Sequence, residues 1–166
     1  EQPFSAPLEQ QARSQPQLVL AAAVVKRDFE VVVRMAVELG VDRLIPVLCE
    51  RTAVQGQLRP DRWRSIATEA AEQCERLWQP EIEAPMPLAD LLDLDEPETL
   101  NLWASARGEG RGDLAALLDQ INPQGAALPA VVHLACGPEG GWSQAEEQEA
   151  LDHGWRAVGQ IGRAHV

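Results

Sequence analysis

The sequence predicts an α/β fold, with one mostly parallel sheet and helices on both of its faces. Short apolar runs alternate with longer segments whose apolar residues recur every three or four positions, and this alternation continues through most of the chain. The chain has 166 residues, enough for one domain with a sizeable core. We expect residues 1–17, which are polar and contain prolines, to be a linker or a trimmed boundary, and residues 18–166 to form the domain.

The first part of the chain is expected to form two strands and the helix between them. The run "LVLAAAVV", residues 18–25, is continuously apolar, which is typical of a buried parallel strand. Residues 29–39 carry apolar side chains at helical spacing, and Gly40 is a favourable residue for ending that helix. The second apolar run, "RLIPVLC" at 43–49, is the second predicted strand.

The middle of the chain is expected to form a long helix followed by shorter elements. Residues 60–78 carry an apolar stripe at helical spacing along their whole length. A short strand is expected near residues 81–84 and a short helix near 88–92. The apolar run "LNLWASA", residues 100–106, is predicted to be the next strand of the sheet.

The last part of the chain repeats the same alternation. Residues 112–121 have the pattern of an amphipathic helix, and "AVVHLAC", residues 130–136, is a strand candidate. A further helix is expected over 143–154, with glycine at its end, and residues 155–161 are expected to form the last strand. These elements complete the β-α alternation that favours a parallel sheet.

Composition excludes several classes of function. The net charge of −12 gives the chain no overall attraction to nucleic acid or to an anionic membrane. The apolar run at 18–25 is far too short to span a bilayer. Cys49, Cys74 and Cys136 are widely spaced, so we expect reduced core thiols in a cytoplasmic protein and no metal site.

The stretch "CGPEGGWSQAEE", residues 136–147, is the strongest candidate for a binding site. It follows a predicted strand directly, and ligands of parallel sheets bind at the carboxyl ends of strands. Its glycines are expected to adopt positive φ and to let a ligand approach the backbone. Ser143 and Glu146 have the spacing of a capping box at the start of the next helix. A tight turn before a well-capped helix, without any ligand, is the alternative interpretation.

The charges around this turn restrict the ligand. The sequence contains neither the P-loop pattern nor G-x-G-x-x-G. A phosphate at the turn would face Glu139, Glu146 and Glu147, with no lysine nearby. The ligand is therefore expected to be neutral or cationic, and S-adenosylmethionine, which carries a sulfonium and no phosphate, fits these requirements.

Several motifs resemble one enzyme family. "GPEGGWS" with its acidic helix is similar to the signature of the SPOUT-class 16S rRNA (uracil-N3) methyltransferases. "KRDFEVVVRMAVELGVDRLIPVLCERT", "RWRSIATEAAEQCERLWQPEI" and, less closely, "VGQIGRA" resemble further motifs of that family in the same order. The resemblance implies a C-terminal trefoil knot, S-adenosylmethionine as cofactor, 16S rRNA of the small ribosomal subunit as substrate, and a homodimer. It also implies that the chain is a methyltransferase domain without the family's N-terminal PUA-like domain.

The resemblance also implies which residues form the site. The cofactor would be held by residues in three segments of the chain: Ser105, Cys136, Gly137, Pro138, Glu139, Gly140, Gly141, Val158, Gly159 and Ile161. Arg163 would stabilise negative charge on the uracil, and Glu139 is the nearest base; the sequence does not choose between them. The motif "VGQIGRA" departs from the usual form near L-G-x-R-I-L-R-A, and the knot is expected to be incomplete if the C-terminal helix of the family is lacking. A catalytically weak or inactive RNA-binding or assembly module of the same fold is therefore the alternative function.

Four arginines and one tryptophan complete the predicted site. Arg51, Arg59, Arg62 and Arg64 are expected to contact RNA phosphates on an otherwise acidic domain. The alternative is a solvated loop in which these arginines form salt bridges with neighbouring carboxylates. Trp142, directly after the glycines, is expected to line the pocket, whereas Trp78, Trp103 and Trp155 are expected to be core residues.

Overall fold

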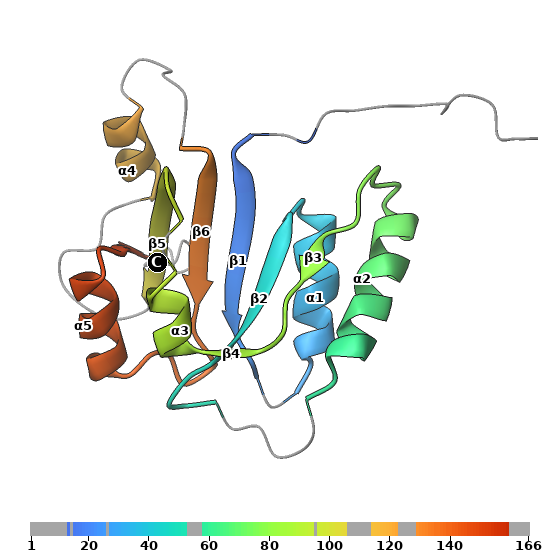
Figure 1. The fold of residues 1–166 in the computed structure, drawn as a ribbon, viewed down its shortest axis with the longest axis horizontal. Coiled ribbons are helices and arrows are strands. Elements are labelled where there is room, and N and C mark those ends of the chain that lie inside the picture. The colour runs from blue at the N-terminus through green and yellow to red at the C-terminus, as the bar shows by residue number, and fades with distance from the viewer. Residues whose placement is uncertain are drawn as a thin grey trace, which may run out of the picture.

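The described part of the chain forms one sheet of seven strands with five helices packed around it (Figure 1). The computed structural model describes residue 13 and residues 15–25, 27–52, 58–94, 96–105, 114–122 and 129–159. The strands are β1 (Gln17–Ala23), β2 (Arg43–Leu48), β3 (Glu81–Ile82), β4 (Met86–Pro87), β5 (Thr99–Ser105), β6 (Val131–Cys136) and β7 (Arg156–Gly159). The helices are α1 (Phe29–Glu38), α2 (Pro60–Gln73), α3 (Leu88–Leu92), α4 (Leu114–Ile121) and α5 (Gln144–Asp152). The α/β prediction is confirmed.

All strand pairs in this sheet are parallel, so the carboxyl ends of the strands lie along one edge. The strand order is β3-β2-β1-β6-β5-β7, and β4 also pairs with β2. Cys136 at the end of β6 aligns with Ala22 of β1 and with Ala104 of β5. The arrows of β1 and β6 in Figure 1 point to this edge, at the bottom of the view. Any segment that directly follows one of these strands is therefore brought to the same edge.

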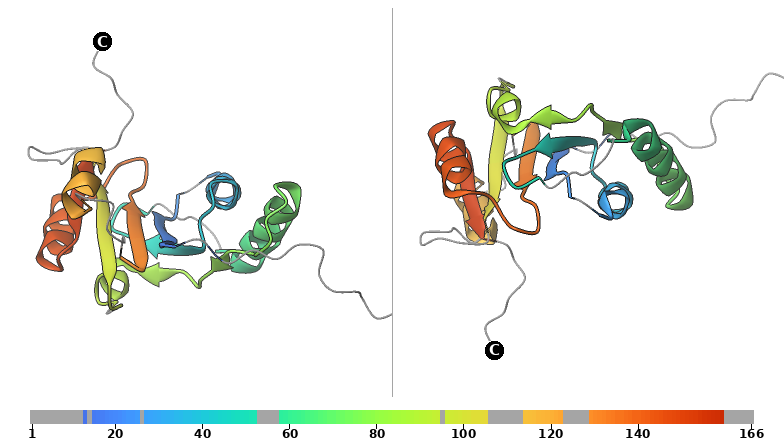
Figure 2. Two further views of the ribbon diagram at one scale, coloured as in Figure 1. Left: turned by 90° about the horizontal axis from the view of Figure 1, so that it is seen from above. Right: turned by 90° about the horizontal axis from the view of Figure 1, so that it is seen from below.

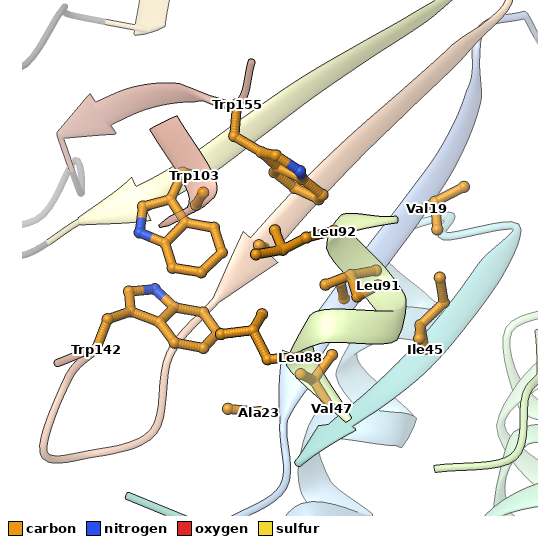
Figure 3. Close-up of a cluster of buried hydrophobic side chains, with 13 residues drawn as sticks. Val19, Ala23, Ile45, Val47, Leu88, Leu91, Leu92, Trp103, Trp142 and Trp155 are labelled. Carbon is orange, nitrogen blue, oxygen red and sulfur yellow. The ribbon is translucent and has the colours of Figure 1, made fainter. Parts of the chain in front are cut away.

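One face of the sheet is covered by α3 and α5. Val19, Ala21 and Ala23 of β1 point to this face, because side chains alternate along a strand. They belong to a core cluster with the leucines of α3 and with three tryptophans, Trp103, Trp142 and Trp155 (Figure 3). The expectation of core tryptophans is confirmed for Trp103 and Trp155, which are 1% and 3% exposed, whereas Trp78 is only half-buried.

The opposite face is covered by α1, α2 and α4. Ala22 and Val24 of β1 pack here against Phe29 and Val33 of α1 and against buried residues of α2. The helix α4 packs on the same face further along the sheet, against leucines of β5 and β6. Figure 2 shows α1 and α3 on opposite sides of the sheet. Helices therefore lie on both faces, as the alternation of segments predicts.

The helix predicted over 60–78 ends earlier than expected. It stops at Gln73, and Glu75 then adopts a positive φ of 55°. Arg76 lies beyond the end and donates to the carbonyls of Val37 and Val41, at 3.0 and 2.8 Å. The chain is thus drawn toward the end of α1, and Leu77, at the end of the predicted apolar stripe, is 46% exposed.

Two further expectations differ from the structure or fall outside it. Cys74 is exposed, since it follows the last turn of α2, whereas Cys49 and Cys136 are half-buried; all three are free thiols. The last strand is described from Arg156 to Gly159. The predicted knot, together with Ile161 and Arg163, depends on residues 160–166, which lie outside the described residues.

Candidate functional site

The glycine turn, residues 137–142, connects the carboxyl end of β6 to the start of α5. Within it, the amide of Gly141 donates to the carbonyl of Pro138 at 2.8 Å. Gly141 has φ of +69°, but Gly137 and Gly140 have no positive φ. The expectation that all three glycines serve positive φ is therefore wrong for two of them, and these two need another explanation.

Gly137 is explained by the packing of Trp142. A Cβ atom at position 137 would lie 3.0 Å from Cε2 and 3.1 Å from Nε1 of the Trp142 indole, closer than ordinary contact. The indole stacks on Trp103, with ring centroids 4.2 Å apart, and its Nε1 donates to the carbonyl of Ala104 at 3.1 Å (Figure 3). Trp142 is 6% exposed and belongs to the core cluster, so it anchors the turn to β5 from the inside.

Gly140 lies at the exposed tip of the turn. A Cβ atom at this position would meet only the Cδ of Arg51, at an ordinary 3.5 Å. Among the hydrogen bonds of the described residues, none uses the amide groups of Glu139 or Gly140. These amides remain able to donate to a ligand, and the lack of a side chain at Gly140 lets that ligand approach the backbone.

The capping box predicted from Ser143 and Glu146 is confirmed, and it has an additional partner. The Ser143 hydroxyl accepts from the amide of Glu146, and the Glu146 carboxylate accepts from the amide of Ser143 at 2.8 Å. The second carboxylate oxygen accepts from the amide of Glu50, beyond the end of β2, at 2.7 Å. Glu146 is 7% exposed with both oxygens bonded, so its negative charge serves the architecture of the turn.

Arg51 contacts the same turn from the other side. Its Nη1 donates to the carbonyls of Gly140 and Trp142 at 2.7 and 3.1 Å, and the carbonyl of Gly141 lies 3.5 Å away. From its sequence, Arg51 was expected to contact RNA together with Arg59, Arg62 and Arg64, and its contact with the turn was not predicted. A charged residue three positions after the end of β2, at the ligand edge, was the available signal.

The other predicted cofactor residues lie at neighbouring strand ends. Ala104 of β5 aligns with both Cys136 and Val158, and Ser105 aligns with Gly159 of β7. The Ser105 hydroxyl donates to the Glu147 carboxylate at 2.6 Å, which ties the end of β5 to α5. The structure therefore brings together the described members of the predicted set: Ser105, Cys136, Gly137, Pro138, Glu139, Gly140, Gly141, Val158 and Gly159.

The titratable groups at this edge restrict its chemistry. Burial raises the pKa of the Cys136 thiol and that of Cys49, so both are protonated at neutral pH and are poor nucleophiles. Glu139 is exposed, and no described residue forms a hydrogen bond or ion pair with its side chain. No group of three potential metal ligands was found in the part of the chain that the structure describes.

The predicted RNA-contacting arginines do not form one continuous group. Arg62 forms an ion pair with Glu30 of α1 at 3.6 Å, whereas Arg64 contacts Asp61 at 2.9 Å and the carbonyl of Ile82. Residues two apart on a helix point in different directions, which accounts for this separation. Arg59 is exposed just before α2, and no described residue pairs with it.

A separate polar cluster lies on the face of the sheet that α3 covers, and its residues were not predicted from the sequence. Arg43 contacts Glu96, Glu83 at 3.2 Å and Nε2 of His133 at 3.1 Å. His133 is 2% exposed, and its burial lowers its pKa. These residues come from two strands and two loops, so no local pattern in the sequence could have joined them.

Comparison with known proteins relates this arrangement to one family. The family model described as an RNA methyltransferase domain matches residues 12–162. The ribosomal RNA small subunit methyltransferase E of Synechocystis is 40% identical over 144 residues, and the match covers 85% of this chain and 46% of that protein. The protein of the same name from Aquifex aeolicus is 27% identical over 136 residues, which cover 80% of this chain and 54% of that protein.

A solved structure with bound cofactor shows the same fold. The ribosomal RNA small subunit methyltransferase E of Neisseria gonorrhoeae, bound to S-adenosyl methionine, matches with a TM-score of 0.77 and 28% identity, over 90% of this chain and 60% of that one. This chain thus spans about half the length of the curated relatives it matches. None of the described helices is long and apolar enough to cross a membrane. With the family model matching most of its length, the chain belongs to the RNA methyltransferase domain family.

Proposed function

We propose that the protein is a methyltransferase that transfers a methyl group from S-adenosylmethionine to N3 of a uridine in 16S rRNA of the small ribosomal subunit. The observation that carries this proposal is the glycine turn at the ligand edge of the sheet, where the amides of Glu139 and Gly140 have no hydrogen-bond partner among the described residues. A relative with the same fold binds this cofactor, and two curated relatives are named for ribosomal RNA methylation.

The residues at this edge fit such a cofactor. Its polar groups would accept from the turn amides, and the strand ends at Ser105 and Gly159 would line the opposite side. The bound cofactor would supply an electrophilic methyl group on a sulfonium cation. Carboxylates at Glu139 and Glu147 leave the edge suited to a cation and unsuited to a phosphate.

Transfer to N3 of uracil requires loss of the imide proton. Glu139 is exposed beside the turn and is free of protein partners among the described residues, so it can reach a substrate proton. Arg163 is the proposed cation for the uracil oxygens, and it lies outside the described residues. Most of the rate would come from holding N3 in line with the methyl group.

The remaining parts of the proposal concern partners. Arg59, Arg62 and Arg64 are proposed to contact rRNA phosphates, with Arg62 and Arg64 exchanging their surface ion pairs for phosphate contacts. Following the family resemblance, we also propose a homodimer that works in the cytoplasm. The exposed apolar residues Val31, Met35 and Leu39, one turn apart along α1, are consistent with a covered helix face.

A direct test is calorimetry with S-adenosylmethionine, followed by transfer of labelled methyl groups to undermethylated small ribosomal subunits. Binding with transfer is the expected result. The departure of the motif "VGQIGRA" from the usual family form favours a second candidate, a non-catalytic RNA-binding module of the same fold. Binding of the subunit without methyl transfer would support that second function.

The glycine turn allows a more specific test of the site. Replacing Gly140 by valine should abolish binding of S-adenosylmethionine, because the added side chain would occupy the approach to the backbone. The fold should remain, since a Cβ atom at Gly140 meets only Arg51 at ordinary distance. Unchanged affinity in calorimetry would exclude the turn as the cofactor site.

A further inference from the structure

Two side chains, those of Arg51 and Glu146, connect the glycine turn and the start of α5 to the segment that follows β2. We call this segment, residues 49–52, the β2 loop. Arg51 of the loop donates to the carbonyls of Gly140 and Trp142, whereas Glu146 beyond the turn accepts from the amide of Glu50. The partners are 89 to 96 residues apart in the chain. Separation of the loop from the turn would therefore require both contacts to break.

Among the described residues, Arg51 is the only side chain that donates to carbonyls of the turn. Gly140, Gly141 and Trp142 present their carbonyl oxygens to one guanidinium nitrogen, at 2.7, 3.5 and 3.1 Å. Converging carbonyl dipoles repel one another without a cation between them, and a hydrogen bond from a charged donor is stronger than one from a neutral donor. Loss of Arg51 would leave these peptide groups held only through their amides, by the bonds of Gly141 to Pro138 and of Ser143 to Glu146.

The orientation of the carbonyls also sets the direction of the turn amides. Each peptide group is planar, so the carbonyl of Gly140 and the amide of Gly141 point in opposite directions. The peptide groups that Arg51 holds include the amides of Gly141 and Ser143, which donate to Pro138 and to Glu146, so Arg51 reinforces the part of the turn that adjoins the free amides of Glu139 and Gly140. A ligand that bonds to the turn then meets donors already in place, and it avoids the entropic cost of ordering them.

We propose that Arg51 is a positioning residue, which holds the glycine turn in its ligand-binding conformation and does not itself bind RNA. This inference rests on the proposed function, and it replaces the RNA contact expected for Arg51 from the sequence. Its guanidinium is engaged with the turn, whereas Arg59 of the same group is exposed without a partner in the described chain. Both the turn and the β2 loop lie at the ligand edge, so Arg51 can hold the turn without any rearrangement of the sheet.

The test compares Arg51→Ala and Arg51→Lys with a matched control, Arg34→Ala. Arg34 is an exposed arginine of α1 that contacts no described residue through its side chain, so its loss changes the net charge equally. Residue-resolved amide exchange by NMR reports on the Gly141 and Ser143 amides without cofactor. Calorimetry with S-adenosylmethionine and urea denaturation report on affinity and on stability.

In Arg51→Ala, we expect the Gly141 amide to exchange about tenfold faster and cofactor affinity to fall about tenfold, as expected for the loss of charged hydrogen bonds. Amides of β1 and β6 should exchange as before. Arg51→Lys should recover part of both losses, because an ammonium can donate to Gly140 but cannot match the planar guanidinium. Arg34→Ala should change neither quantity. The lysine variant also provides the comparison if the alanine variant unfolds.

Three outcomes separate this inference from its alternatives. Unchanged exchange at Gly141 and Ser143 in a folded Arg51 variant would overturn the inference, whatever the cofactor affinity. Weaker rRNA binding with unchanged turn exchange would also overturn it, and would return Arg51 to the RNA contacts. A wild-type chain that binds no S-adenosylmethionine would instead contradict the proposed function, and the exchange rates would then decide the role of Arg51 in holding the turn.

Discussion

At the scale of single residues, the glycines of the turn serve three different needs. Gly141 adopts a backbone conformation that other residues rarely adopt, and Gly137 makes room for the Trp142 indole. Gly140 needs neither, and its lack of a side chain leaves room for the cofactor proposed to bind here. The acidic residues near the turn also differ in role. Glu146 and Glu147 accept hydrogen bonds within the protein, whereas Glu139 is exposed.

Gly137 and Gly140 should therefore respond differently to the same substitution. Gly137→Ala places a methyl group 3.0 Å from the Trp142 ring, and overpacking of this kind costs about 1–3 kcal/mol in unfolding free energy. Gly140→Ala should change stability by less than about 0.5 kcal/mol. Urea denaturation of both variants, followed through tryptophan fluorescence, measures the difference. Equal destabilisation would show that the Trp142 contact does not explain Gly137.

His133 provides a second test at this scale. Its pKa is lowered by burial and by Arg43, so the folded state resists protonation that the unfolded chain accepts below its ordinary pKa of 6.5. The contribution of neutral His133 to the unfolding free energy is therefore fully present above pH 6.5. It falls as the pH drops toward the lowered pKa, by at most about 1.4 kcal/mol per pH unit.

Replacement of His133 by glutamine keeps an acceptor for Arg43 and removes the titration. The unfolding free energy of the variant should therefore fall less than that of the wild type between pH 7 and pH 5.5. His153, which is exposed and has a raised pKa, contributes in the opposite direction, so His153→Gln is the control. The prediction fails if His133→Gln and the wild type lose the same stability over this range.

At the scale of elements, α5 depends on a single carboxylate for both its start and its attachment. Glu146 closes the capping box with Ser143 and also holds the β2 loop through Glu50. A buried carboxylate that accepts two amide donors is stabilising because both donors would otherwise lose their hydrogen bonds. The Glu146 carboxylate thus links the start of α5 and the end of the turn to the segment after β2.

Glu146→Gln should destabilise the protein by about 1–3 kcal/mol, because an amide side chain can accept only one of these donors well. Glu149→Gln, on an exposed position of the same helix, removes the same charge and should stay within about 0.5 kcal/mol of the wild type. Chemical denaturation of the two variants measures their unfolding free energies. Similar destabilisation in both would mean that the lost charge, rather than the hydrogen bonds of Glu146, causes the effect.

At the scale of the whole molecule, the sequence predicted elements better than their assembly. Strands and helices were located because apolar periodicity is a local signal, and the capping box was readable for the same reason. The strand order was not predictable, because runs such as residues 18–25 are apolar on both faces and carry no information about their neighbours. The contacts of Arg51 and Glu146, about ninety residues apart in the chain, arise from that strand order.

Charge is the other property of the whole molecule that bears on function. With a net charge of −12, the chain cannot rely on general attraction to RNA, so its binding should depend on few phosphate contacts. Of the arginines expected to bind RNA, Arg59, Arg62 and Arg64 remain after Arg51 is assigned to the turn.

The salt dependence of rRNA binding should reflect this small number. Each neutralised phosphate contributes about 0.7–0.9 to the slope of log affinity against log salt, so three contacts give a slope no steeper than about −3. Replacing Arg59, Arg62 and Arg64 together by alanine should bring the slope close to zero, and Arg34→Ala should leave it unchanged. The slope can be measured by fluorescence anisotropy with a small-subunit rRNA fragment, at salt concentrations from about 50 to about 300 mM. A steep slope that survives the triple substitution would mean that other residues hold the RNA, and that these arginines serve only the surface ion pairs in which Arg62 and Arg64 are found.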